Sequence, residues 1–482
     1  MKSDALSTRA VVLLVAALVL ADITSAFETT MVFTAVKSLL EEYGRPTTVG
    51  WLLTAYLLMS AASSAICGRL GDIYGRRKVL LIMLVLAGAG SVVSALSPHL
   101  EGVILGRFLQ GFSGAILPLT IGLTREHVPQ KHLPVCVGIV SASSAAGGGL
   151  GMLLGGILID HYGWRAIFWA SSAFVFVSMA AALLWVPRSQ TAPRTGALDL
   201  AGGLLFVPAV AGGLLAMSNA REWQLDIRFW GLLAASVALF AAWVRHELRH
   251  SNPLIEVRLL ANPAIAIPNL AMSLCALGAF QFSQMVLLLL QQPVWTGVGL
   301  GLTATLAGAL KLPGNFITAA SSPVTGWACG RFGGGLVVGI GMTLTSLCCL
   351  AVLAQPANLP LIVGATIIIA IGTATVYVAV PAILVQAAPL GRTSETIGMF
   401  SVIRSLSMAI GSQGMLVLLA SSTVKDPSGG AAVFPALPAY QMTLGVMAAL
   451  CVATALVALR FPRSQNGRTP TAPLKEPALS DA

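Results

Sequence analysis

The chain has 482 residues, of which 56% are hydrophobic and only 10% charged, and its mean hydropathy is +0.85. Because soluble globular proteins carry roughly 25% charged residues, this composition excludes a soluble enzyme, a secreted disulfide scaffold and a disordered chain. The formal charge of +10 is spread over short loops without interleaved aromatic residues, so it gives no support to nucleic-acid binding. The composition indicates an integral membrane protein with many spans.

A transmembrane helix needs about 20 mostly apolar residues, and fourteen stretches of the chain meet this requirement. In chain order they cover residues 10–35, 49–68, 79–97, 101–123, 134–158, 165–186, 198–218, 229–245, 264–289, 301–324, 335–354, 359–385, 396–420 and 440–460. Lys2 and Arg9 precede the first stretch, as in a signal peptide. Because this stretch carries Asp22 and Glu28 and thirteen more follow, we interpret it as a retained span.

The loops predict the organisation and the orientation of the chain. We expect an N-terminal six-helix bundle in 1–187, a linker with two extra transmembrane helices in 188–262, a C-terminal six-helix bundle in 263–461 and a disordered tail in 462–482. Of the 28 Lys and Arg residues, nineteen fall in loops on the side of the N-terminus, six on the opposite side and three inside predicted spans. Because basic residues accumulate in cytoplasmic loops, both termini are predicted to be cytoplasmic. The expected location is the plasma membrane, or the inner membrane of a bacterium.

Two acids, Asp22 and Glu28, lie inside the first predicted span. They are six residues apart and therefore point about 120° away from each other on a helix. Both have small and polar neighbours, which fit the lining of a cavity better than a lipid-facing surface. A carboxylate whose hydration changes with the state of the cavity can bind and release a proton, so both are candidate coupling sites. Alternatively, Glu28 sits at the outer membrane interface near Lys37 and has no coupling role.

The loop after the second span, residues 68–78 (GRLGDIYGRRK), combines glycines, one acid and a basic cluster. Glycine allows a tight turn, and the acid can pair with an arginine or cap a helix. An ordinary cytoplasmic loop needs only the basic residues. The order closely resembles the loop signature of the major facilitator superfamily, whose transporters consist of two six-helix bundles. The resemblance implies that Asp72 and Arg76 form a latch that holds one conformation, within a switch loop made of Gly68, Gly71, Asp72, Gly75, Arg76 and Arg77.

Arg107 lies inside the fourth predicted span, in the stretch 107–111 (RFLQG). Because an arginine at the centre of a span costs at least a few kcal/mol, it faces the bundle interior, a partner or water, or it snorkels to the interface. The stretch also resembles the fourth-span motif of the same superfamily. That resemblance implies a role in proton transfer for Arg107.

The fifth predicted span is rich in glycine. Four-residue spacing lets helices approach closely in lipid, so packing alone could explain the pattern. The stretch resembles the antiporter motif of drug exporters in the superfamily, although Met152 stands where that motif has a proline. The matching positions are Gly147, Gly151, Gly155 and Gly156.

The two extra spans and the first-span segment 27–36 resemble the fourteen-span drug:proton antiporter family. Glu28 takes the place of that family's aspartate, and Phe33 stands where an asparagine is usual. The second half of the chain carries a degraded copy of the loop signature in residues 326–335 (GWACGRFGGG). In this copy Gly330 replaces Asp72 and Gly334 replaces Arg76, as expected of a two-bundle transporter with an internal repeat.

Lys311 lies inside the tenth predicted span. A buried lysine needs an acidic partner or an anionic ligand, so it pairs with Glu28 or Asp22, favours an anionic substrate, or snorkels to the interface. Arg404, in the thirteenth span, resembles a basic position common in the family and is given no substrate role. The six histidines lie in or beside loops, without paired metal spacing inside a span, and we expect no metal site and no cofactor.

The leading hypothesis is a proton-coupled secondary active transporter that exports small organic or drug-like compounds by alternating access. The alternatives are a proton-coupled importer, which Met152 favours slightly, and a lipid-translocating flippase. An enzyme is not expected, and the chain contains no phosphate-binding Gly-x-x-x-x-Gly-Lys-[Ser/Thr] loop. The expected partners are the substrate, protons and the lipid bilayer, and the resemblance implies a monomer.

Overall fold

The computed structural model describes residues 8–44, 46–129, 133–188, 199–220, 223, 226–250, 253, 257–388, 393–425 and 433–461. The first part of the chain forms α1 (Thr8–Tyr43), α2 (Pro46–Tyr74), α3 (Arg76–Leu96), α4 (Leu100–Gln110), η1 (Gly111–Ala115), α5 (Ile116–His127), α6 (Leu133–Tyr162) and α7 (Arg165–Trp185). The linker forms α8 (Leu200–Asn219) and α9 (Ile227–Arg249).

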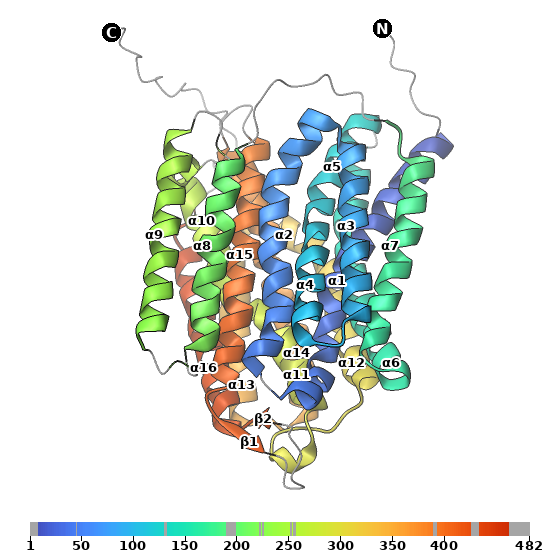
Figure 1. The fold of residues 1–482 in the computed structure, drawn as a ribbon. Coiled ribbons are helices and arrows are strands. Elements are labelled where there is room, and N and C mark those ends of the chain that lie inside the picture. The colour runs from blue at the N-terminus through green and yellow to red at the C-terminus, as the bar shows by residue number, and fades with distance from the viewer. Residues whose placement is uncertain are drawn as a thin grey trace, which may run out of the picture.

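The remainder of the chain is also mostly helical. It forms η2 (Val257–Ala261), α10 (Pro263–Leu277), η3 (Ala279–Gln281), α11 (Phe282–Gln291), η4 (Val294–Thr296), α12 (Ala304–Phe332), α13 (Gly334–Ala354), α14 (Leu359–Ala387), α15 (Thr393–Leu419), β1 (Thr423–Lys425), β2 (Val433–Pro435) and α16 (Leu437–Ala458). Figure 1 shows the long helices standing side by side. We call the end at which α1 begins and α16 ends the terminal end, and the end that carries β1 and β2 the distal end.

Each of the fourteen predicted stretches falls on a helix or on a consecutive helix pair. In the described part of the chain, ten helical segments are long and apolar enough to cross a membrane. The all-helical membrane fold is therefore confirmed in outline, whereas the count of fourteen spans stays a prediction. The predicted tail, residues 462–482, lies outside the described residues.

Two strands depart from the all-α prediction. β1 and β2 pair antiparallel between α15 and α16, with Val424 opposite Phe434. Each strand has only three residues, so the search for long apolar stretches could not detect them. The hairpin lies at the distal end (Figure 1), where the chain turns back from one helix into the next.

The two linker helices are central in the sequence but peripheral in space. α8 packs against α9, α2 and α15, and Figure 1 places both linker helices at one flank of the molecule. The two bundles meet each other directly, because α2 packs against α15 and α6 against α12. The exposed face of α9 carries large apolar side chains such as Trp230 and Val237, as expected of a lipid-facing helix.

The loop signature and its degraded copy fold into the same turn. α2 ends at Tyr74 and α3 begins at Arg76, with Gly75 between them at φ 93° and ψ 125°. α12 and α13 are joined in the same way by Gly333, at φ 87° and ψ 138°. Because side chains disfavour this positive φ, glycine is needed at both positions. The internal repeat predicted from the sequence is therefore present in the backbone of these two connections.

The buried apolar clusters show where the bundles are joined. One cluster contains residues of both bundles, including Met31 of α1, Leu52 of α2, Met285 of α11 and Leu416 of α15, and its members lie toward the distal end. We call this cluster the distal seal. A second cluster, which includes Leu14 and Leu80, is built from the N-terminal bundle alone and lies toward the terminal end. A third cluster joins Leu57 of α2 to the linker and the C-terminal bundle, including Phe400 of α15. The distal seal is thus the cluster that joins α1 to the C-terminal bundle, and it lies in the distal half.

Candidate functional site

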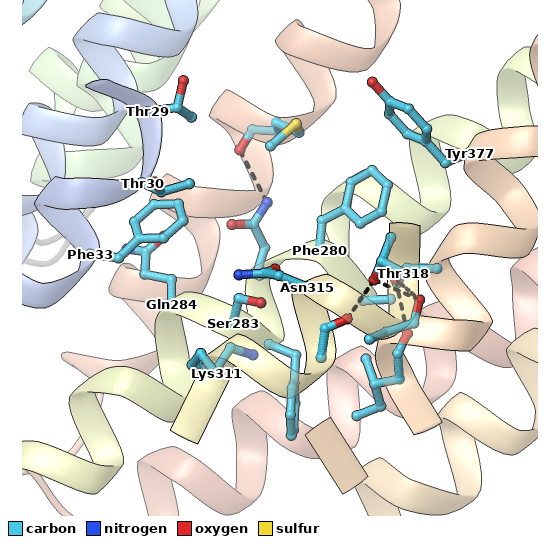
Figure 2. A pocket seen from close by; sticks show the side chains of 18 of the residues that line it. Thr29, Thr30, Phe33, Phe280, Ser283, Gln284, Lys311, Asn315, Thr318 and Tyr377 are labelled. Atoms are coloured by element: carbon cyan, nitrogen blue, oxygen red, sulfur yellow. Dashed lines mark hydrogen bonds between the residues drawn. The ribbon is translucent and has the colours of Figure 1, made fainter. Parts of the chain in front are cut away.

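A cavity of about 600 Å³ lies between the two bundles (Figure 2). This volume is within the usual range for a drug-sized ligand, roughly 300–1,000 Å³. The N-terminal bundle contributes a lining from α1, α2 and α6, and the C-terminal bundle contributes the connection from η3 to α11 together with α12, α14 and α15. The described lining is aromatic, aliphatic and polar, and it contains two basic residues, Lys311 and Arg404, but neither aspartate nor glutamate.

The cavity extends toward the terminal end. Its lining includes Pro323 in the second half of α12 and Arg404 in the first half of α15, both of which lie on the terminal side of the cavity. The distal seal closes the opposite side, because it joins α1 and α2 to α11, α12 and α15. A compound in the cavity is therefore separated from the distal side by buried apolar residues from both bundles.

An interruption between α10 and α11 forms one wall of the cavity. α10 ends at Leu277, and Gly278 has a non-helical backbone with φ −108° and ψ −86°. The residues after the break, including Phe280 and Gln281, line the cavity. Irregular backbone is tolerated at membrane depth where it faces a cavity or protein. The break divides the predicted span 264–289, which was expected to be continuous, and Gly278 with the nearby glutamines is the feature of the sequence that marks it.

Glu28 lies in a buried polar network inside the N-terminal bundle. Its side chain is 0% exposed, and its Oε1 accepts hydrogen bonds from Ser171 at 2.9 Å and Ser91 at 3.3 Å. Ser91 in turn accepts a 2.6 Å hydrogen bond from Gln110. The second carboxylate oxygen, Oε2, has no hydrogen-bond partner among the described residues. Glu28 is thus held on one side only, and it lies away from both the cavity surface and the interface near Lys37.

Arg107 connects this network to the cavity wall. It is 0% exposed, and it donates to Gln110 at 2.8 Å and to the backbone carbonyls of Glu28 and Leu52 at 2.8 and 3.0 Å. Its guanidinium lies 4.4 Å from the centre of the Tyr56 ring, and Tyr56 lines the cavity. Arg107 therefore faces the bundle interior, and snorkelling to the interface is excluded.

A row of hydroxyl groups continues from this point. The Tyr56 hydroxyl is 2.8 Å from Thr29 Oγ1, at the cavity surface, and 2.9 Å from Ser113 Oγ, inside the bundle. Sequence reasoning missed Tyr56 and Ser113, because a single tyrosine or serine in an apolar helix carries no signal. Together with Arg107 and Gln110 they form a polar connection between the cavity and the surroundings of Glu28.

Asp22 occupies a different environment from Glu28. It is 1% exposed, and its Oδ2 accepts hydrogen bonds from Ser144 at 2.9 Å and Ser143 at 3.2 Å, both on α6. Ser144 also lines the cavity. The predicted angular separation of the two acids is therefore expressed as two separate networks: Asp22 faces α6, whereas Glu28 faces α3 and α7.

Lys311 points into the cavity from α12 (Figure 2). Its side chain is buried, at 5% exposed, and it makes neither an ion pair nor a hydrogen bond with any described residue. Its ammonium lies 5.9 Å from the centre of the Phe282 ring. The sequence left open an ion pair of Lys311 with Asp22 or Glu28, and the structure shows no such pair among the described residues. Arg404 lies on the terminal side and donates a 2.9 Å hydrogen bond to Tyr377.

The glycines of the antiporter-like motif pack α6 against two neighbouring helices. Gly147 lies against Ile23, Gly151 against Phe27 and Gly155 against Met31, so that three glycines meet successive turns of α1. On another face of α6, Gly156 lies against the start of α12, where a Cβ would clash with the Ala304 carbonyl. Small residues at this spacing permit close helix contact, which explains the motif by packing.

Met152, which stands where the motif has a proline, lies in an unbroken α6 and lines the cavity.

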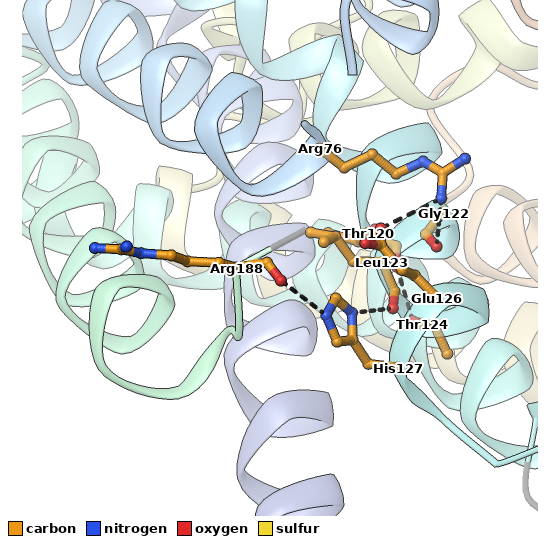
Figure 3. Close-up of polar contacts among 8 residues, drawn as sticks. All are labelled: Arg76, Thr120, Gly122, Leu123, Thr124, Glu126, His127 and Arg188. Atoms are coloured by element: carbon orange, nitrogen blue, oxygen red, sulfur yellow. Dashed lines mark hydrogen bonds and ion pairs between the residues drawn. The ribbon is translucent and has the colours of Figure 1, made fainter. Parts of the chain in front are cut away.

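The switch loop is tied to helices of its own bundle (Figure 3). Arg76 donates to the Gly122 carbonyl at 3.2 Å and pairs with Glu126 at 3.5 Å, both on α5. Arg77 donates a 2.7 Å hydrogen bond to the Leu183 carbonyl of α7. The side chain of Asp72 lies outside the described residues, as does the surface of Gly68, so the predicted Asp72–Arg76 latch stays a prediction. Glu126, which the sequence analysis overlooked, is the acid described beside Arg76.

A contact at the distal end joins the two bundles through one carboxylate. Asp160, near the end of α6, accepts hydrogen bonds from the backbone N–H groups of Ala304 at 3.0 Å and Thr305 at 2.7 Å, the first residues of α12. Partial burial alone would raise the pKa of Asp160, but the hydrogen bonds from the α12 terminus outweigh it and hold that pKa below its ordinary value. Asp160 was not singled out from the sequence.

One group of described residues could hold a metal ion. Asp199, His246 and His250 place ligand atoms within 4.8 Å of one another between α8 and α9. His246 Nε2 lies 2.8 Å from Asp199 Oδ1. This group is remote from the cavity lining. His246 and His250 are four residues apart, but they lie just beyond the predicted span 229–245, where paired histidines were not expected, and Asp199 is distant from them in the sequence.

Comparison with known proteins places this geometry in context. The family model described as Major Facilitator Superfamily matches residues 18–412. The tetracenomycin C resistance and export protein of Streptomyces glaucescens is 30% identical over 392 residues, which cover 78% of this chain and 70% of that protein. A multidrug resistance protein B homolog of Mycobacterium tuberculosis is 30% identical over 309 residues, covering 61% of this chain and 57% of the relative.

Solved structures show the same fold. The xylose transporter of E. coli, in a partially occluded inward-open conformation, aligns with a TM-score of 0.63 and 14% identity, covering 96% of this chain and all of that one. The matched family and these proteins are transporters and not enzymes.

Proposed function

The chain belongs to the major facilitator superfamily, and from this premise we propose that it exports small organic compounds in exchange for protons. Resistance and export proteins for tetracenomycin C and for multiple drugs are among its relatives, and they support a drug-like substrate. The bias of basic residues toward the terminal end supports a cytoplasmic location for that end, in the plasma membrane. The cavity would then face the cytoplasm, and the protein would act as a monomer.

The observation that carries the proposal is the buried network between Glu28 and the cavity. On the cavity side the hydroxyl groups of Tyr56 and Ser113 are hydrogen-bonded to each other, and on the carboxylate side Gln110 and Ser91 connect Arg107 to Glu28. Arg107 joins the two parts, because its guanidinium lies over the Tyr56 ring and donates a hydrogen bond to the Glu28 carbonyl. Substrate in the cavity touches Tyr56 and Thr29, so its arrival can alter the same contacts that position Arg107.

Coupling follows if protonation of Glu28 and occupation of the cavity favour opposite states. Protonation neutralises Glu28, which then no longer attracts Arg107. The proton can bind at the unpaired oxygen Oε2, so that the hydrogen bonds from Ser171 and Ser91 to Oε1 stay intact. A charge moved across the membrane is worth about 2.3 kcal/mol per 100 mV, so a site that exchanges protons uses both the pH gradient and the potential. Asp22 is the second candidate, because Ser144, which donates a hydrogen bond to it, lines the cavity.

The test is transport in inside-out vesicles with an imposed pH gradient, screened over cationic, neutral and anionic aromatic compounds. Glu28→Gln keeps the shape of the side chain but cannot exchange a proton. We expect this variant to lose gradient-driven accumulation while it retains substrate counterflow. Glu101→Gln, at an exposed acid in the first turn of α4, is the matched control and should behave as the wild type.

Asp22→Asn distinguishes the two acids. Loss of accumulation in Asp22→Asn but not in Glu28→Gln would move the coupling site to Asp22. Full proton-driven transport by both variants would contradict coupling at the first helix. Gradient-driven movement into the compartment facing the terminal end would indicate an importer, and movement of lipid alone would indicate a flippase.

A further inference from the structure

The buried cation in the cavity is placed to meet a ligand. Lys311 is 5% exposed, lines the cavity and is not paired with any acid in the described part of the chain. Its aromatic neighbour, Phe282, is near the outer limit for a cation–π contact, about 6 Å, so this contact compensates the charge only weakly. A buried ammonium without a counter-ion favours a ligand that brings a negative charge.

Acids that could neutralise the cavity are held elsewhere. The described lining contains neither aspartate nor glutamate, although it contains Lys311 and Arg404. The two buried acids of α1 accept hydrogen bonds from serines. Asp22 accepts them from Ser143 and Ser144, and Glu28 accepts them from Ser91 and Ser171. The lining is therefore positively charged, which disfavours a cationic compound beside Lys311.

A second residue of the cavity wall has an unused hydrogen-bond donor. Gln284 is 2% exposed and lines the cavity; its Oε1 accepts a hydrogen bond from Ser412 at 3.2 Å, while its Nε2 has no acceptor among the described residues. Asn315, one helical turn after Lys311 on α12, presents its Nδ2 toward Met152 Sδ at 3.9 Å, a weak acceptor. Figure 2 shows Lys311, Gln284 and Asn315 gathered in one region of the cavity. Each of them can donate to an oxygen anion.

The rest of the cavity is suited to a flat apolar body. Phe33, Phe280 and Tyr377 line it together with aliphatic side chains of α2 and α14. A cavity of about 600 Å³ is much larger than a small inorganic anion needs. We propose that Lys311 and Gln284 form an anion subsite for the carboxylate or enolate group of an aromatic organic compound, whose apolar body lies against the aromatic walls. This inference rests on the proposed function, because it names the class of compound that the exporter carries.

The test compares three compounds of the same size with purified protein in detergent and no gradient. The probes are anthracene-9-carboxylate, its neutral carboxamide and 9-(aminomethyl)anthracene, which is cationic at pH 7.5, and binding is measured by equilibrium dialysis. We expect the Kd of the carboxylate to be at least about tenfold lower than that of the other two compounds, which corresponds to a difference of about 1.4 kcal/mol in binding free energy. Lys311→Gln should abolish this preference without weakening carboxamide binding, whereas Lys311→Arg should keep most of it.

Lys425→Gln is the charge-matched control, because it removes one exposed basic residue at the end of β1 and should leave the preference unchanged. Micelle partitioning is the same for every variant and cancels in the comparison. A preference for the cationic compound, equal binding of all three, or a carboxylate preference that survives Lys311→Gln would overturn the anion subsite.

Gradient-driven transport of the same compounds separates this inference from the exporter hypothesis. Accumulation of the cationic or neutral compound with no carboxylate preference would contradict only the anion subsite. A Lys311-dependent carboxylate preference without accumulation of any of the three would support the subsite and contradict the exporter.

Discussion

Replacing Asp160 by alanine removes a carboxylate that caps the first turn of α12 from the opposite bundle. In the present arrangement Asp160 accepts hydrogen bonds from the N–H groups of Ala304 and Thr305, at 3.0 and 2.7 Å. These groups have no acceptor within their own helix, and the positive end of the helix dipole faces the acid. If α6 and α12 part at the distal end during alternating access, this contact exists only in the distally closed state.

The size of the effect follows from this geometry. A charge at a helix terminus contributes about 0.3–1 kcal/mol when exposed and up to about 2 kcal/mol when partly buried. Because Asp160 is solvent-exposed, the range for an exposed charge applies, and we expect a loss of about 0.3–1 kcal/mol that salt screens further. That loss shifts the ratio of closed to open states by a factor of about 2–5.

The assay measures how often the distal seal opens. A cysteine replaces Ala307, which is 0% exposed in the distal seal and does not line the cavity, and a membrane-impermeant maleimide is added from the distal side. Asp160→Ala should raise the labelling rate about 2–5-fold, in line with the open population. Asn358→Ala is the control, because Asn358 caps Leu361 in the first turn of its own helix, α14, and does not contact the opposite bundle through this bond.

The pH dependence has a definite sign. Because the pKa of Asp160 is lowered in the closed state, its stabilisation is complete above the ordinary aspartate value, about 3.9, and is lost as the pH falls through the lowered value. The stabilisation of the closed state by Asp160 should therefore be constant between pH 8 and pH 6, and Asp160 should cause no change in the fraction of protein open to labelling over this range. An unchanged labelling rate in Asp160→Ala, or an equal rise in Asn358→Ala, would refute the role of Asp160 in distal closure.

The remaining predictions concern the packing of α6 and the switch loop. Gly151→Ala should destabilise the protein by about 1–3 kcal/mol, because its Cβ would come within 3.1 Å of the Phe27 backbone and closer still to the Thr30 hydroxyl. Gly148→Ala meets only a methyl group at 3.5 Å and should be close to neutral in the same thermal-unfolding measurement in detergent; equal midpoints would argue against tight α1–α6 packing. Asp72→Asn should nearly abolish transport while membrane insertion stays intact, and near-normal transport by a well-expressed variant would remove Asp72 from the mechanism.

Local features of the chain were predictable from sequence. Long apolar stretches mark the helices, because a membrane span has a minimum length and composition that any segment must satisfy by itself. The turn at Gly75 and its copy at Gly333 were predictable for a similar reason, since a tight connection with positive φ requires glycine. Glu28, Arg107 and Lys311 were candidates for the bundle interior because an unshielded charge in lipid is costly, but the sequence left the membrane interface open for each, and their burial in the structure decides between the two.

Only the tertiary structure decided which neighbours these residues meet. Helices that are apolar on every face carry no period that orients them, so the sequence could not direct Glu28 toward α3 and α7 or Asp22 toward α6. The cap of Asp160 on α12 and the group of Asp199 with its two histidines join residues distant in the chain. The peripheral position of α8 and α9 likewise depends on how the bundles pack. The sequence by itself determined the helices and their buried charges, whereas packing between near-uniform apolar surfaces determined the cavity, its positive lining and the distal seal.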